Sequence, residues 1–81
     1  QVSADEARKA RDSAIAAQVS SLLARDAELA SLGIAVDSLD GHVMLRGSTP
    51  NTAARKRAGE LARSVIGVLE VDNALNVQPR P

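Results

Sequence analysis

The chain has no cysteine, tryptophan, tyrosine or phenylalanine among its 81 residues. Without cysteine there is no disulfide framework, no thiol nucleophile and no thiolate metal site. Without aromatic rings there are no stacking platforms for single-stranded nucleic acid, and the core has to be built from aliphatic side chains. A chain of this length forms one small domain of modest stability around a single core.

The charge of the chain requires any electrostatic recognition to be local. Ten basic and ten acidic residues cancel, so no global field draws the chain to nucleic acid or to a membrane. No run approaches the roughly 18 apolar residues of a transmembrane segment. The chain starts at Gln1 and has no basic and then apolar signal region. Because the initiator Met is missing, we expect a processed or excised piece.

The sequence contains no recognisable reaction centre. His42 is the single histidine and follows the turn pair Asp40-Gly41, where an exposed polar residue is expected. No ligand spacing typical of a metal site can be written around it. The glycines at 33, 41, 47, 59 and 67 fit neither a phosphate-binding loop nor the GXXG loop of an RNA-binding KH domain. We therefore predict a non-enzymatic protein without catalytic residues, metal, cofactor or nucleic-acid partner.

A first amphipathic helix is predicted by apolar residues at i, i+4, i+7 and i+8, which are Ile15, Val19, Leu22 and Leu23. Its start is open, because Asp12 and Ser13 are possible local caps and Ser3 with Glu6 forms a capping box. We expect contact with the core to begin near Ile15. Residues 3–11 are then either an exposed helical overhang or disordered.

A short helical turn and a β-hairpin are expected next. Asp26 is a suitable cap for a turn over residues 27–32, which Gly33 closes. Residues 34–39 alternate in polarity as a strand does, and the alternation resumes in residues 42–47, with Gly47 as the end of the second strand. The Asp40-Gly41 pair between them tolerates the positive φ angles of a type I′ turn.

A second long helix and a third strand complete the pattern. Pro50 is suited to the first helical position, and Gly67 is suited to end the helix. Its apolar stripe consists of Ala54, Ala58, Leu61, Ala62 and Val65. Residues 68–77 alternate as a strand. The predicted fold class is therefore α+β, an αββαβ two-layer sandwich with two helices on one face of a three-stranded sheet.

Two motifs carry a resemblance to a known family. Residues 41–47 read G-x-V-x-L-x-G, and residues 67–77 read G-V-x-x-V-x-N-x-L-x-V. Together with the helical patterns they resemble the BON domain of bacterial cell-envelope proteins. The resemblance divides the chain into an N-terminal extension or helix overhang (1–11), a BON-like domain (12–77) and a flexible tail (78–81).

The resemblance implies a function as well as a fold. It implies a non-enzymatic bacterial envelope module, usually periplasmic or part of a lipoprotein, with links to osmotic stress and proposed attachment to phospholipid. The expected partners are anionic phospholipid head groups or neighbouring envelope proteins. The alternative is a structural protein–protein adaptor that binds no lipid. The sequence leaves the lipid, the oligomeric state and the strand order open.

Two surfaces are candidates for binding. The second long helix carries a basic group that would attract anionic lipid, Arg55, Lys56, Arg57 and Arg63, although Glu60 is placed to pair with two of them. The first helix has an uncharged face suited to a partner protein, formed by Ala17, Ser20, Ser21 and Ala24. The alternative interpretation of either group, which we favour, is an ordinary solvated helix surface.

Overall fold

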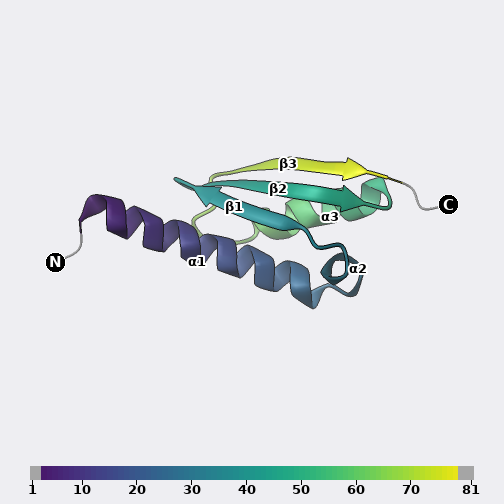
Figure 1. The fold of residues 1–81 in the computed structure, drawn as a ribbon, viewed down its shortest axis with the longest axis horizontal. Helices are drawn as coiled ribbons and strands as arrows, with labels where there is room; N and C mark the ends of the chain where they lie inside the picture. The colour runs from purple at the N-terminus through teal and green to yellow at the C-terminus, as the bar shows by residue number, and fades with distance from the viewer. Residues whose placement is uncertain (1–2, 79–81) are drawn as a thin grey trace.

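The computed structural model describes residues 3–78 of the chain (Figure 1). Its elements follow the predicted order, and the short helical turn after Asp26 is the helix α2: α1 (Ala4–Arg25), α2 (Ala27–Ala30), β1 (Ala35–Leu39), β2 (His42–Thr49), α3 (Thr52–Arg63) and β3 (Glu70–Val77). The three strands form one sheet in the order β1-β2-β3. Strand β2 is central, antiparallel to β1 and parallel to β3.

Helices α1 and α3 both lie against the same face of the sheet, and no helix within residues 3–78 covers the other face, which is called the uncovered face below (Figure 1). The core between the layers is aliphatic, as predicted. Its buried members are Ile15, Val19, Leu23, Leu29, Val43, Leu45, Ala54, Ala58, Ala62, Val65 and Leu75. The small side chains of the three buried alanines let α3 approach the sheet closely. The α+β class and the αββαβ two-layer arrangement are confirmed.

Helix α1 uses the earlier of its two possible starts. The Ser3 hydroxyl accepts a hydrogen bond from the Glu6 amide at 3.1 Å, as an N-cap does. The first turns of the helix extend past the end of the sheet and are exposed (Figure 1). Contact with the body of the domain begins at Arg8, which pairs with Asp40 at 3.2 Å, and at buried Asp12, which accepts the Asp40 amide at 3.0 Å.

The two predicted turns have the expected geometry. Asp40 has φ 52° and Gly41 has φ 83°, so both central residues of the hairpin turn are in the positive region that a type I′ turn requires. Gly33, which closes α2, has φ 64°. The Asp26 carboxylate caps α2 by accepting hydrogen bonds from the amides of Glu28 and Leu29 at 3.0 and 3.3 Å.

The boundaries of strand β2 and helix α3 differ from the prediction. Gly47 does not end β2, because the strand continues to Thr49, in register with Val77 of β3. Pro50 is not the first helical residue. Asn51 is the N-cap, and its side-chain oxygen accepts the Ala54 amide at 2.8 Å. The parallel pairing with β3 extends β2 through the glycine and moves the helix start two residues along the chain.

Strand β3 begins at Glu70 rather than at Val68. The Leu69 amide donates to the Gly41 carbonyl at 2.8 Å, so this part of the connection is held by the hairpin turn and not by the strand ladder. At the other end, the Gln78 amide donates to the Thr49 carbonyl at 2.7 Å. Residues 79–81 of the expected tail lie outside the described part of the chain.

Candidate functional site

The basic residues of α3 have different environments. The Arg55 guanidinium turns toward the sheet, where Nε donates to the Leu75 carbonyl at 3.0 Å and Nη2 to the Asn73 carbonyl at 2.9 Å. Arg55 is half-buried. It therefore belongs to the packing between α3 and β3, and it does not share the outward direction expected for the basic group.

Arg57 is held by an ion pair with Asp26, the residue that joins α1 to α2. The Asp26 side chain is almost covered, with 8% of its surface exposed, whereas 62% of the Arg57 side chain is exposed. Burial alone would raise the pKa of Asp26. Hydrogen bonds from the Glu28 and Leu29 amides and from the Arg57 guanidinium outweigh burial, together with the charge of Arg57, and lower that pKa below its ordinary value.

Lys56 and Arg63 remain as the outward cations of α3. Both are exposed, and within residues 3–78 neither has a carboxylate oxygen closer than 4.0 Å. They are seven residues apart, which places them on one face of the helix two turns from each other. Glu60 lies between them in sequence without an ion pair to either. The structure thus reduces the predicted group of four to two unpaired cations with an acid between them.

The four uncharged residues of α1 that were predicted to bind a partner are exposed. Ala17, Ser20, Ser21 and Ala24 follow the outer ridge of the helix, on the side away from the core. Ser20 and Ala24 border a shallow groove toward α2, and Ser21 borders another toward the connection that follows α3. The ridge separates two shallow grooves, and no charged side chain interrupts it.

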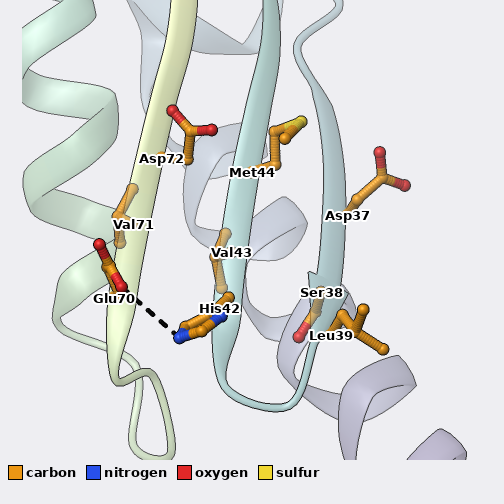
Figure 2. Close-up of a pocket in the computed structure, with 9 residues that line it drawn as sticks. All are labelled: Asp37, Ser38, Leu39, His42, Val43, Met44, Glu70, Val71 and Asp72. Carbon is orange, nitrogen blue, oxygen red and sulfur yellow. Dashed lines mark ion pairs between the residues drawn. The ribbon is translucent and has the colours of Figure 1, made fainter.

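The uncovered face of the sheet carries a surface that the sequence analysis did not consider. A depression of about 580 Å³ is bordered there by residues of all three strands. Figure 2 shows these residues, with Met44 on the central strand. Leu39 is 65% exposed and Met44 37% exposed on this face. Ion pairs join its strands, Arg46 with Asp37 and His42 with Glu70. The alternation of side chains along β1 and β2 is a sequence signal from which the outward direction of these residues could have been predicted.

His42 and Glu70 are the pair in this depression to consider as a general base and its partner. His42 Nε2 lies 3.5 Å from a Glu70 carboxylate oxygen, and the side chains are 65% and 74% exposed (Figure 2). Ser38 borders the same depression but is the register partner of buried Val43, so its side chain is directed to the core side of β1. Its hydroxyl has no hydrogen-bond partner there. Serine and histidine therefore do not meet as nucleophile and base.

Two negative findings apply to residues 3–78. No group of three or more histidine, cysteine, aspartate or glutamate side chains is arranged to hold a metal ion. No helix in this part of the chain has both the length and the apolar character that crossing a bilayer requires.

The fold is that of a small two-layer α+β domain with an αββαβ order of its main elements. The model of the BON domain family matches residues 11–79, and the chain belongs to that family. No curated protein matches the chain. BON domains are non-catalytic binding domains associated with phospholipid, with the cell envelope and with osmotic stress.

Proposed function

We propose that this domain attaches to anionic phospholipid surfaces, on the periplasmic side of a bacterial envelope. The observation that supports this function most is the pair of exposed cations on the outer face of α3, Lys56 and Arg63, neither of which has an ion pair among residues 3–78, in a domain of a family associated with phospholipid. Arg57 is next to Lys56 on α3, but its positive charge is partly offset by the ion pair with Asp26. Arg55 keeps its positive charge, but its guanidinium donates to the carbonyls of Leu75 and Asn73 and is turned away from the exposed patch.

The expected attachment is weak and sensitive to salt. Each basic residue near an anionic membrane contributes about 1 kcal/mol, and Glu60 offsets part of this. Exposed charges are screened over about 8 Å at physiological ionic strength. The affinity for anionic vesicles should therefore fall steeply as salt is raised, and neutral vesicles should bind much less.

Co-sedimentation of the full chain with vesicles tests this proposal. Vesicles of phosphatidylglycerol and phosphatidylcholine should retain the protein at low salt, and vesicles of phosphatidylcholine alone should not. Arg63→Glu should weaken retention strongly, and Lys56→Glu combined with Arg63→Glu should abolish it. The matched control is Arg46→Glu, which changes the net charge equally on the uncovered face of the sheet. Equal loss in Arg63→Glu and Arg46→Glu would mean that net charge, and not this patch, governs binding.

A protein-binding adaptor is the second candidate function. It is favoured by the uncharged outer ridge of α1, where Ala17, Ser20, Ser21 and Ala24 are all exposed. Backbone amide NMR spectra separate the two functions. Lipid attachment through α3 should shift amides around Lys56 and Arg63 when anionic vesicles are added. If no amide shifts at low salt with excess anionic lipid, the adaptor function becomes the better account.

A further inference from the structure

Ile66 is the most exposed of the large apolar side chains in the described part of the chain, with 94% of its surface accessible. It lies at the tip of a turn between α3 and β3. The Val68 amide donates to the Val65 carbonyl at 3.2 Å and closes this turn, and Gly67 supplies a φ of 100°. Val65 is buried in the core. Ile66 is thus held away from the domain by a fixed backbone.

Two arginines lie near this turn, one in space and one in sequence. A shallow groove of about 390 Å³ separates the turn from α1, and Arg25 borders it together with Ile66. Arg63 is the last residue of α3, three positions before Ile66. Both arginines are exposed, and neither has a carboxylate oxygen within 4.0 Å among residues 3–78.

We infer that Ile66 is an apolar anchor that enters the head-group region of an anionic bilayer, with Arg25 and Arg63 against the lipid phosphates. This inference rests on the proposed attachment to phospholipid and extends it to the end of the helical layer. Charge alone gives only marginal attachment here, because two cations and one acid make up the α3 patch. An apolar insertion together with basic residues is the combination that stabilises interfacial binding.

The shape of the site favours a bilayer over a protein partner. Ile66 protrudes from its turn, and the groove beside it is lined by the polar residues Gln18, Ser21 and Ser64 as well as by Leu22 and Val65. A specific protein interface needs about 800 Å² of matched surface on each partner. A lipid head-group region deforms around one protruding side chain and supplies the phosphates that the arginines require.

Single-tryptophan variants of the full chain test the insertion directly, because the chain has no tryptophan of its own. Ile66→Trp should show a blue-shifted emission with phosphatidylglycerol-containing vesicles and quenching by brominated lipid, with neither effect on phosphatidylcholine vesicles. The control is Leu39→Trp. Leu39 is also a largely exposed aliphatic residue, but it is on the uncovered face of the sheet, so its emission should stay that of an indole in water.

Affinities measured by co-sedimentation give the second readout. Ile66→Ser should weaken binding to anionic vesicles roughly tenfold, since the burial of an aliphatic side chain is lost, and Leu39→Ser should not change it. Arg25→Gln should weaken binding roughly fivefold, as loss of one cation at a charged surface predicts. Arg46→Gln removes the same charge from the opposite layer and should have little effect.

The outcomes separate this inference from the proposed function. If the parent binds anionic vesicles while Ile66→Ser binds equally well and Ile66→Trp is not quenched, the anchor is overturned and lipid attachment stands. If the parent does not bind at low salt, both are overturned. An emission shift of Ile66→Trp that follows protein concentration without lipid would also overturn the anchor, in favour of contact with a second copy of the chain.

Discussion

Arg55 and Asn73 form a reciprocal pair of hydrogen bonds between α3 and β3. Arg55 donates to the carbonyls of Asn73 and Leu75, and the Asn73 side-chain amide donates to the Arg55 carbonyl at 2.7 Å. Strand β3 is at the edge of the sheet, where alternate backbone groups have no neighbouring strand. Gly59 leaves the space for this contact, because a Cβ there would lie 2.9 Å from the Asn73 amide nitrogen.

Removing the Arg55 guanidinium should destabilise the domain. Arg55→Met keeps the aliphatic part of the side chain but leaves two partly buried carbonyls without donors, which should cost about 1–3 kcal/mol of the free energy of unfolding. Urea denaturation measures the loss. Lys56→Met is the control on the same helix, and it should stay within about 0.5 kcal/mol of the parent because Lys56 is exposed. Equal losses in the two variants would show that the Arg55 hydrogen bonds contribute nothing particular.

Asp26 makes stability depend on pH in the acid range. The pKa of Asp26 is lowered in the folded state: burial opposes ionisation, but the capping amides and Arg57 outweigh it. Its contribution is therefore fully present above the unfolded pKa of about 3.9 and is lost as the pH falls through the lower folded pKa.

Asp26→Asn should remove this pH dependence, because asparagine can still cap α2 but cannot ionise or pair with Arg57 as an anion. Thermal unfolding of the parent and the variant between neutral and acid pH measures this dependence. The stability difference between parent and variant should shrink as the pH falls through this range. Asp72→Asn is the control, since Asp72 is exposed and has no ion pair among residues 3–78. If the stability difference between the parent and Asp26→Asn is constant with pH, the pKa of Asp26 is not lowered in the folded state.

At the scale of elements, the β1–β2 turn and the α3–β3 connection are packed against each other through Gly41. A Cβ on Gly41 would lie 2.8 Å from Leu69 Cγ and 3.2 Å from the Gly67 carbonyl oxygen. Gly33 has a similar positive φ, but its Cβ position has no atom within 4 Å. A side chain at Gly33 would therefore meet backbone strain alone, whereas a side chain at Gly41 would meet both backbone strain and steric overlap.

Gly33→Ala should cost about 1–2 kcal/mol, the expected penalty for an L-residue in the left-handed region. Gly41→Ala should cost at least about 1 kcal/mol more, because the added methyl group also displaces Leu69. Denaturant melts of the two variants give the comparison. If both lose the same amount, the connection moves aside freely and the contact between the two elements is loose.

The order and type of the elements could be predicted from the sequence because they depend on local signals. The Asp26 cap and the Asp40-Gly41 turn are both of this kind. The wrong boundaries are those that distant partners decide: β2 passes through Gly47 because β3 pairs with it, and Leu69 is held by Gly41 instead of by the ladder. Local sequence patterns do not show which distant residues will pair.

The same reason limits what the sequence says about the binding surface. Helical periodicity places a residue on a face of α3, but it does not identify its partner. The pairing of Arg57 with Asp26 and of Arg55 with β3 joins residues far apart in the chain. The exposure of Ile66 depends on Val65 entering the core and the next residues turning away. The surface sites of this domain therefore require the tertiary structure.

The whole molecule is an asymmetric pair of layers, with helices on one face of the sheet and solvent on the other (Figure 1). The uncovered face is joined by exposed cross-strand ion pairs, each of which contributes only about 0.2–1 kcal/mol. Stability must then come mainly from the aliphatic core. A small domain has about 5–15 kcal/mol of total stability, so a single core side chain is a large share of it.

Leu45 and Met44 are neighbours on β2 that face opposite sides of the sheet and test this asymmetry. Leu45 is fully buried against the helices, whereas Met44 is 37% exposed on the uncovered face. Leu45→Ala should cost about 2–5 kcal/mol, enough to leave a marginal domain partly unfolded at room temperature. Met44→Ala removes a side chain of similar size from the same strand and should cost clearly less, because no cavity forms. Urea melts followed by circular dichroism measure both. Equal losses would mean that the uncovered face contributes as much stability as the core, and that another element covers it in solution.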